Sequence, residues 1–302
     1  METNFNEIKQ EILSRAKKAG ACKDEYSRAY IAKTLSELSQ VIKDNFYWVC
    51  DNGILTVDLI EQYKEDFAAN DIYANQNVKS GYLLCNNATV EAYDSVTVWA
   101  YGGSTVKAYG NTTVWARDNA KIKAYDNSTV DACDSTMIES YSNAKIDAFD
   151  RAKIRAYDNS TVEAAGNSMI EIYNNAMVMA YDWATIWASD NAKVRAYDIA
   201  TIGASGNAKV EAFDSTVVTA YDSTIILACN NTIVKAYNNA TVRASENVTV
   251  EARDNTKVEA RDNAYCTSSY TIDCKLSDNA IYRDQSTDTV YYADSNIKFV
   301  KQ

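Results

Sequence analysis

An eight-residue unit repeats 22 times from Thr89 to Ala264 without one insertion or deletion. From its first position the unit reads Thr or Lys, Val or Ile, a variable residue, Ala, Tyr, Asp or Gly, Asn, and a small residue. The second position is Val or Ile in all 22 units, and the fourth is Ala in 20. Such regularity predicts a stacked architecture in which every unit has the same structure.

The parity of the octad indicates a strand followed by a turn. In an extended chain the second, fourth and eighth positions lie on one side, and the first, third and fifth lie on the other. The sixth and seventh positions, such as Asp126 and Asn127, are residue types that tolerate left-handed backbone and favour turns. A helix would instead need apolar residues at 3.6-residue spacing. We therefore expect the apolar side of each strand to face inward.

One octad cannot bury its own Val or Ile, so successive strands must stack about 4.8 Å apart. This predicts a mainly β fold, a parallel β-solenoid (β-helix). Tyrosine occupies the fifth position of every odd unit from the first to the eleventh, which favours two octads per 16-residue coil. The small inward residues also favour a thin, two-sheet core. The alternative is three octads per 24-residue coil, which an aromatic column in every third unit favours: Tyr101, Tyr125, Phe149, Tyr173, Tyr197 and Tyr221.

Composition excludes most enzyme classes. The chain has no proline, as continuous strand pairing requires, and no histidine, the commonest general base and metal ligand. It contains no nucleophile elbow, phosphate loop or dinucleotide fingerprint, and unbroken octads leave no loop from which to build a cleft. We expect a non-enzymatic protein with no cofactor, no catalytic residues and no metal site.

Charge and cysteine usage indicate a cytoplasmic protein. The net charge of -11 is spread along the chain with no basic stripe, so we do not expect direct nucleic-acid binding. Residues 1–18 contain neither a signal-peptide apolar region nor a membrane-spanning run, so we expect no membrane association. The odd number of cysteines and the absence of Cys-x-x-Cys indicate reduced thiols. Cys266 and Cys274, at inward second positions, are expected to be small core residues.

The two ends depart from the octad pattern. We expect an α-helical cap domain over residues 1–70, the solenoid over 71–280 and a C-terminal β-hairpin cap over 281–302, with strands at 281–282 and 290–292. Tyr82 and Leu84 are predicted to face inward in a terminal coil of larger residues. Helix signals define three segments of the cap: residues 4–18 stopped by Gly20, a Thr34 and Glu37 capping box leading into 38–50, and a stretch through Phe67 capped by Thr56.

Three sequence features together resemble a known group of proteins. They are the helical head with A-C-K-D-E-Y at 21–26 and D-N-F-Y-W at 44–48, the D-N-A-T-V-x-A-Y octads, and the T-V-Y-Y-A-D...I-K-F tail at 289–299. The chain is similar to uncharacterised octapeptide-repeat β-solenoid proteins of gut bacteria and their phages. The resemblance carries no activity or site residues, but it implies a phage or mobile-element origin, and hence the host cytoplasm.

Apolar residues at outward or corner positions are the main candidate binding site. Contiguous exposed apolar area on a soluble protein marks an interface, so we expect a protein partner of unknown identity, with a side-by-side homodimer preferred. The alternative is contact with the chain's own head or tail. Trp99 and Trp115 are expected to form a smaller patch nearer the cap. The main candidates are Met169, Met177, Met179, Trp183, Trp187, Val217, Ile225, Leu227 and Ile233.

Fifth-position tyrosines are the second candidate. Ring-on-ring ladders stabilise stacked strands, and the same rings offer a stacking surface for a protein, a glycan or bases. The predicted ladder residues are Tyr93, Tyr101, Tyr109, Tyr125, Tyr141, Tyr157, Tyr173, Tyr181, Tyr197, Tyr221 and Tyr237.

Aspartate fills the sixth position in 13 of 22 units and predicts an acidic corner. We expect each side chain to bind local backbone in its turn; bridging by calcium is the alternative, although the glycines of calcium-binding β-helix repeats are missing. Representative members are Asp94, Asp118, Asp126, Asp134, Asp150 and Asp158.

These features predict a scaffold or protein-binding solenoid that acts through its side faces and self-associates. One alternative is a phage or mobile-element anti-defence inhibitor, anti-CRISPR-like or a nucleic-acid mimic, that blocks a host nucleic-acid-handling enzyme. A further alternative is a structural or surface protein of a phage particle.

Overall fold

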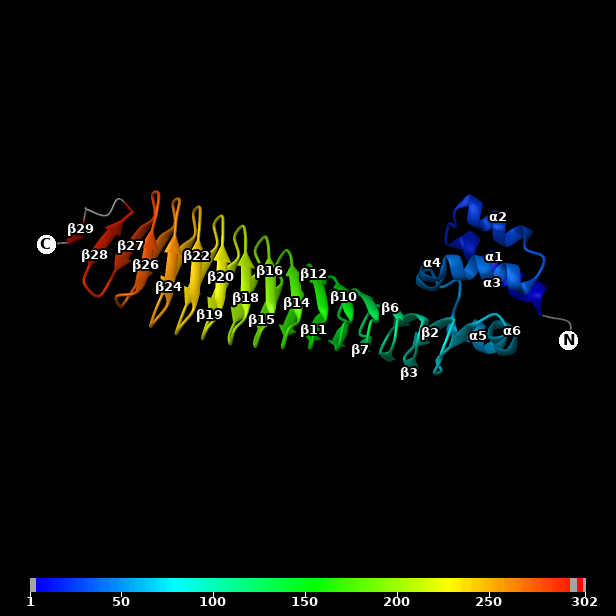
Figure 1. The fold of residues 1–302 in the computed structure, drawn as a ribbon. Helices are drawn as coiled ribbons and strands as arrows, with labels where there is room; N and C mark the ends of the chain where they lie inside the picture. The colour runs from blue at the N-terminus through cyan, green and yellow to red at the C-terminus, as the bar shows by residue number, and fades with distance from the viewer. Residues whose placement is uncertain (1–3, 294–297, 301–302) are drawn as a thin grey trace. The chain divides into compact units, whose positions relative to one another are not determined.

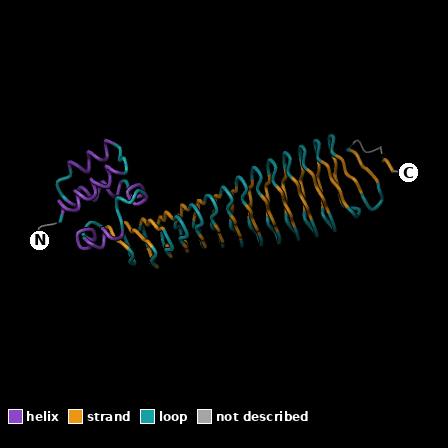
Figure 2. Tube along the Cα trace, turned by 180° about the vertical axis from the view of Figure 1, so that it is seen from behind, coloured by secondary structure: helices purple, strands orange, loops and turns teal. Residues whose placement is uncertain are grey.

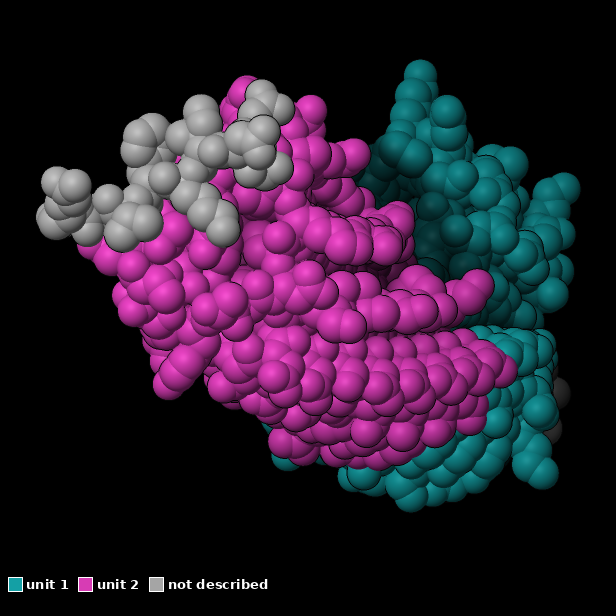
Figure 3. All heavy atoms as spheres, turned by 60° about the vertical axis from the view of Figure 1, so that its left-hand side comes forward, with its two compact units in different colours: residues 1–137 teal, residues 138–302 magenta. Residues whose placement is uncertain are grey.

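The computed structural model describes residues 4–293 and 298–300. Within them, six helices precede 29 strands (Figures 1 and 2). The chain divides into two compact units, residues 1–137 and 138–302, which are coloured separately in Figure 3. The first unit holds the helices and the first strands, and the second holds the later strands, whose side chains form parallel rows on the surface. None of the described helices is long and apolar enough to cross a membrane.

The helices, called here the helical head, confirm the predicted α-helical N-terminal region. Two predicted caps are present: the Thr34 hydroxyl accepts from the Glu37 N–H at 3.2 Å, and the Thr56 hydroxyl accepts from the Leu59 N–H at 3.3 Å. The helix predicted over 38–50 is interrupted at Asn45, where φ is -120°. The helices are α1 Phe5–Lys18, α2 Lys23–Ile31, which the sequence did not predict, α3 Leu35–Asp44, α4 Phe46–Asp51, α5 Val57–Gln62 and α6 Lys64–Ala68.

The strands form two sheets, called here sheet A and sheet B. Consecutive octads alternate between them, so that neighbours within a sheet are two octads apart. Sheet A contains, in order, β1 Ile72–Ala74, β2 Tyr82–Asn86, β4 Thr97–Tyr101, β6 Thr113–Ala116, β8 Thr129–Ala132, β10 Lys145–Ala148, β12 Thr161–Ala164, β14 Met177–Ala180, β16 Lys193–Ala196, β18 Lys209–Ala212, β20 Ile225–Ala228, β22 Thr241–Ala244, β24 Lys257–Ala260 and β26 Asp273–Leu276. Sheet B contains β3 Thr89–Ala92, β5 Thr105–Ala108, β7 Lys121–Ala124, β9 Met137–Ser140, β11 Lys153–Ala156, β13 Met169–Ile172, β15 Thr185–Ala188, β17 Thr201–Ala204, β19 Val217–Ala220, β21 Ile233–Ala236, β23 Thr249–Ala252, β25 Tyr265–Ser268, β27 Ile281–Asp284, β28 Thr289–Tyr292 and β29 Lys298–Val300.

This order confirms the parallel β-solenoid with two octads per 16-residue coil. In sheet B, for example, Thr185 pairs with Thr201 and Ile186 with Ile202, each sixteen residues apart. The alternative of three octads per coil is wrong, because the aromatic column that favoured it takes residues alternately from the two sheets.

The core lies between the two sheets, where the second and fourth positions of every octad are buried. Burying a Val or Ile side chain contributes about 1.5 to 3 kcal/mol, and this term recurs in every strand. Several buried eighth-position hydroxyls are satisfied within their own turn; that of Thr224, for example, donates to the Tyr221 carbonyl at 2.6 Å. Among the described residues, the hydroxyls of Thr136 and Ser168 are buried without a hydrogen-bond partner.

The corners close because their sixth residue adopts left-handed backbone. Values of φ at Asp198 and Gly206 are 56° and 68°. The N–H of the next residue then donates to the sixth-position carbonyl one coil earlier, as from Ile199 to Asp182 at 3.1 Å. Corner backbones are therefore joined from coil to coil, like the strands.

One register prediction is wrong. Strand β2 pairs with β4 at a spacing of fifteen residues, so that Tyr82 lies beside Thr97 and Leu84 beside Trp99, all facing outward. A shift of one residue exchanges the two faces of a strand. The inward residues of β2 are instead Leu83 and Cys85, which are buried.

At the other end, β27 and β28 pair in antiparallel fashion and confirm the predicted hairpin strands. Residues 294–297 and 301–302 of the predicted cap lie outside the described residues. Cys266 is buried, as predicted, whereas Cys274 is half-buried. The hydrogen bond with the Cys274 thiol and burial both raise the pKa of the Cys266 thiol.

Candidate functional site

The outward face of sheet A is covered by the helical head at its first strands. The Tyr47 ring of α4 meets the Trp99 ring edge-on at 4.8 Å between centroids, and the Trp115 ring at 5.7 Å. As a result Trp99 is only 2% exposed and Trp115 is half-buried. The predicted exposed patch of these two tryptophans is therefore wrong, because the head packs on it.

Arg117, at the fifth position after β6, also binds the helical head to this face. Its Nη1 lies 2.9 Å from Asp51 Oδ1, and its Nη2 donates to the Tyr47 hydroxyl. Its guanidinium lies 5.5 Å from the centroids of the Tyr47 and Trp99 rings. Partial burial acts to lower the pKa of Arg117, but the Asp51 carboxylate and Tyr47 outweigh it and raise the pKa.

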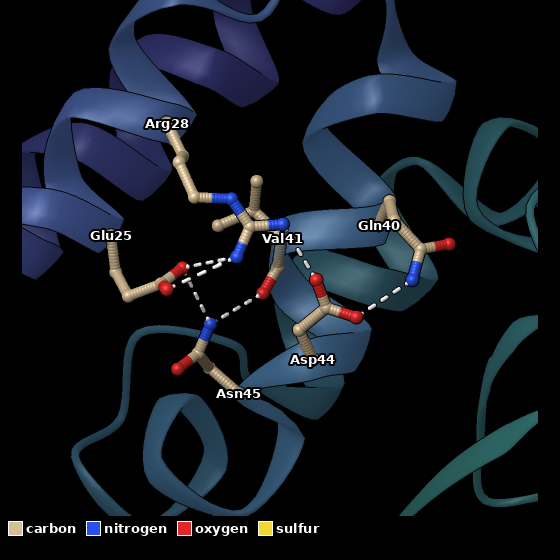
Figure 4. A network of polar contacts seen from close by, with 6 residues as sticks. All are labelled: Glu25, Arg28, Gln40, Val41, Asp44 and Asn45. Atoms are coloured by element: carbon tan, nitrogen blue, oxygen red, sulfur yellow. Dashed lines mark hydrogen bonds and ion pairs between the residues drawn. The ribbon is translucent and has the colours of Figure 1, made fainter.

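A polar network braces the head (Figure 4). The guanidinium of Arg28 in α2 bonds both oxygens of Glu25, at 2.8 and 3.0 Å, and Asp44 Oδ2 of α3 at 2.6 Å. Asn45 Nδ2 donates to Glu25 Oε2 and to the Val41 carbonyl, each at 3.0 Å. The hydrogen bond from Arg28 lowers the pKa of Asp44.

The nine apolar candidates do not form one patch, because the structure divides them between two sheets. Trp183 lies at a corner between β14 and β15. Sheet A carries Met177 and Met179 on β14 and Ile225 and Leu227 on β20, and sheet B carries Met169, Trp187, Val217 and Ile233.

On sheet B, three neighbouring strands have no charged outward residue. They are β15, β17 and β19, and we call their outward residues the neutral face: Thr185, Trp187, Thr201, Gly203, Val217 and Thr219. The uncharged strands β14 and β20 of sheet A each lie between strands that carry charged outward residues. Among the described strands, the other neutral run of three or more neighbours includes β2, β4 and β6, on which the head packs.

Trp187 is the largest side chain of the neutral face and is 49% exposed. Its Cδ1 lies 3.3 Å from the point where a Cβ on Gly203 would sit, so the glycine of β17 leaves room for the indole of β15. At the margin of this face, Trp183 and Ile199 are 61% and 52% exposed. Ile199 is not among the residues predicted from the sequence, although an apolar residue at the seventh position, which is usually Asn, is a signal that could have identified it.

Charged residues flank the neutral face on both sides. Glu171 of β13 pairs with Arg155 of β11 at 3.0 Å, on one side. On the other side lie Lys235 of β21 and Glu251 of β23, which are neighbours in the sheet. Within the described part of the chain, Lys235 has no ion pair, so a cation at this edge is available to a partner.

The tyrosines form ladders at both corners. Tyr157 and Tyr173 stack at 5.0 Å between centroids with planes 9° apart, and other stacked pairs are similar. Tyr101 instead packs against the helical head. The stacked residues include, beside sheet B, Tyr93, Tyr109, Tyr125, Tyr141, Tyr157, Tyr173, Tyr221 and Tyr237 and, beside sheet A, Tyr181, Tyr197 and Phe213.

Glutamates in the third position hold several ladder hydroxyls. Tyr173 donates to Glu171 at 3.0 Å and Tyr141 donates to Glu139 at 3.1 Å. Partial burial and the adjacent Glu171 raise the pKa of Tyr173. These contacts give the ladder a structural role; its use as a binding surface stays a prediction.

The acidic corner residues bind backbone, but not in their own turn. Asp118 Oδ2 accepts from the Gly102 N–H at 2.9 Å, and Asp134 Oδ2 accepts from the Asp118 N–H at 3.2 Å. Likewise, Asp126 Oδ2 accepts from the Gly110 N–H and Asp158 Oδ2 accepts from the Ser142 N–H, each across sixteen residues. Their carboxylates thus join neighbouring coils, and Asp94 and Asp150 share the left-handed backbone. Among the described residues, no group of three or more His, Cys, Asp or Glu is placed to hold a metal ion.

No protein-family model, curated protein or solved structure matches this chain.

Proposed function

We propose that this chain is a non-enzymatic scaffold that self-associates through the outer face of sheet B. A second copy packs on this face about a two-fold axis that runs along β17. A half-turn about the strand direction reverses the order of the strands and keeps their direction. Strand β15 then faces β19 of the second copy, β13 faces β21 and β11 faces β23, with first positions opposite first positions and third opposite third.

The observation that most supports this proposal is that residues at equal distances on either side of β17 are complementary in charge and polarity. Glu171 of β13 faces Lys235 of β21, and their charges are opposite. Arg155 of β11 faces Glu251 of β23, again with opposite charges. The first-position residues Met169 and Ile233 are both apolar and face one another. Because the arrangement is isologous, each of these contacts is made twice.

Side-chain size is complementary as well. Trp187 of β15 faces the smaller Thr219 of β19, and Ser189 after β15 faces Tyr221 after β19. At the axis, Gly203 faces its own copy and leaves room beside it for the indole of Trp187. Large residues thus meet small ones across the axis, as shape complementarity requires.

The size of this face sets the expected affinity. Seven strands from β11 to β23, about 4.8 Å apart, span about 29 Å, and a strand with its corners is about 15 to 20 Å wide. The planar footprint is about 400 to 600 Å² per copy, below the roughly 800 Å² of a typical stable interface. We therefore expect a dimer with a Kd of about 1 to 100 μM.

The test is a single lysine placed on the axis. Thr201 is exposed on β17 and faces its own copy, so Thr201→Lys brings two like charges together; lysine already occupies this octad position at Lys193 and Lys209. The matched control is Thr241→Lys, at the same octad position on sheet A. Sedimentation velocity across about 1 to 300 μM should show a monomer for the first variant and the wild-type dimer for the control. A wild-type chain that stays monomeric over this range would falsify the proposal.

A charge exchange tests the register. Lys235→Glu should weaken the dimer, because it then faces Glu171. Adding Glu171→Lys should restore association, since the two charges are again opposite. Damage to the fold would accumulate in the double variant, so a double variant weaker than Lys235→Glu alone contradicts this register.

The corner carboxylates accept hydrogen bonds from neighbouring backbone. For this reason we propose that the protein acts through the face of sheet B, and we do not propose acidic mimicry of nucleic acid or a role in a phage particle. Reversing exposed charges at Asp150 and Asp158 separates the two ideas: association through sheet B should persist, whereas binding of a basic enzyme groove should be lost.

A further inference from the structure

A groove of about 590 Å³ opens on the outer side of sheet A, beside the corner that follows β18 to β24. We call it the sheet A groove. Its lining includes Phe213, Leu227, Cys229, Ser245, Arg261 and Lys275. All of these lie in the second unit, and none belongs to the neutral face.

The groove exists because an aromatic ladder stops there. Tyr181, Tyr197 and Phe213 stack at 5.2 and 5.1 Å, with planes 7° and 12° apart. The next two fifth-position residues are Cys229 and Ser245, which have no rings. The ladder therefore leaves the outer face of Phe213 beside the space lined by these two small residues.

The opposite corner shows how a ladder ends when it has no gap. There Tyr221 stacks on Tyr237 at 5.1 Å, and the guanidinium of Arg253 follows one coil later, 5.7 Å from the Tyr237 centroid. In the groove the corresponding arginine is Arg261, three coils after Phe213. At about 4.8 Å per coil, two rings fit between them at ladder spacing.

The far end of the groove has cationic side chains whose charge is only partly neutralised by neighbouring carboxylates. Arg243 is paired with Glu259 at 3.0 Å, and Glu211 with Arg195 at 2.6 Å. Arg261, by contrast, has one ion pair with a described residue, to Asp262 at 3.7 Å. Lys275 has no ion pair within residues 4–293 of the structure. In a chain of net charge -11, this local positive excess selects an anionic group.

We propose that the sheet A groove binds a planar aromatic anion. Its ring stacks on Phe213 over Cys229 and Ser245, and Leu227 forms the apolar wall. Its acidic group pairs with Arg261 and Lys275, and the guanidinium of Arg261 caps the stack. A purine nucleotide and an aromatic sulfonic or carboxylic acid share this chemistry.

Titration calorimetry with adenosine monophosphate and with 2-naphthalenesulfonate distinguishes the two sources. At least one should bind with a sub-millimolar Kd, and its uncharged counterpart, adenosine or 2-naphthalenemethanol, should bind about tenfold more weakly. Failure of both anions to bind below about 1 mM overturns the proposal, as does equal binding of the uncharged compounds.

Filling the gap should abolish binding. Ser245→Tyr adds a ring to the ladder and occupies the ligand's place, whereas the control Ala165→Tyr adds a ring at the same octad position of sheet A outside the groove. Unchanged binding by the folded Ser245→Tyr variant contradicts the stacking site.

The double variant Arg261→Ala with Lys275→Ala decides the question even if Ser245→Tyr does not fold. It should lose about tenfold in affinity for the anion and none for the uncharged compound, while Lys193→Ala changes neither. Binding by Thr201→Lys should equal wild type, so that failure of the groove and failure of self-association are separate results.

Discussion

Two runs of uncharged strands, one in each unit, differ in what lies on them. On β2, β4 and β6 the outward tryptophans are covered by the helical head, and Trp99 is 2% exposed. On β15, β17 and β19 the outward tryptophan, Trp187, is 49% exposed. Both runs replace the usual Lys, Glu and Arg by Thr, Trp or other uncharged residues. The first run shows that this replacement accompanies packing against another folded element, which supports an external cover for the second.

The covered run should be far more sensitive to charge than the exposed one. Trp99→Lys removes a buried ring and places an ammonium group under Tyr47, so it should cost about 3 to 5 kcal/mol. Urea unfolding followed by circular dichroism measures this loss. Because each coil contacts only its neighbours, we expect the first unit to unfold before the second. A loss below about 1 kcal/mol would mean that the head contributes little to covering this strand.

The same substitution on the exposed run should give the reverse result. Trp187→Lys changes a half-exposed side chain, so the free energy of unfolding of the monomer should change by no more than about 0.5 to 1 kcal/mol. The proposed dimer should weaken at least about tenfold, because in the proposed arrangement Trp187 faces the second copy. Equal unfolding losses for Trp99→Lys and Trp187→Lys would break the comparison.

The contribution of the corner beside the exposed run to stability can be tested at its left-handed residue. Asp198 has φ of 56°, and its Oδ2 accepts from the Asp182 N–H at 3.1 Å. Asp198→Ala loses this bond and retains the left-handed strain, and should cost about 1 to 2 kcal/mol. Asp198→Gly should cost less, because glycine adopts this backbone freely, as Gly206 does one octad later. Equal melting temperatures for the two variants would contradict this account.

The smallest expected effect concerns the stability of the helical head at acid pH. The pKa of Asp44 is lowered in the folded head by its hydrogen bond from Arg28. The stabilisation is therefore present above the unfolded pKa of about 4 and is lost as the pH falls through the folded value. Asp44→Asn should remove this pH dependence with a loss under about 1 kcal/mol, since the pair is exposed. Acid titration of head helicity measures it; an unchanged acid midpoint would exclude this role.

Several features of the fold were predictable because their cause is local. The alternation within each octad places Ile202 and Ala204 inward, and the caps at Thr34 and Thr56 begin helices as expected. The two-octad coil followed from the tyrosines in odd units. The break at Asn45 and the fifteen-residue step before Thr97 left no comparable pattern, so the helix over 38–50 and the inward placement of Tyr82 were wrong.

For a related reason, the sequence predicted the residues of the candidate site but not which of them share a surface. Trp187 and Leu227 look alike in the sequence, since both occupy the third position of an octad. They lie on different sheets because neighbouring octads alternate, and only the pairing of strands sixteen residues apart reveals which of them share a surface. Trp115 looks similar again, yet Tyr47, 68 positions earlier in the chain, packs on it.

The sequence by itself determined the strand, the corner and the inward face of every octad, because these depend on residues within eight positions. Tertiary structure alone decided which outward residues are neighbours, which are covered and where a ladder of rings leaves a groove. The physical reason is that such surfaces are assembled from contacts between distant residues, and a short repeat records only its own local geometry.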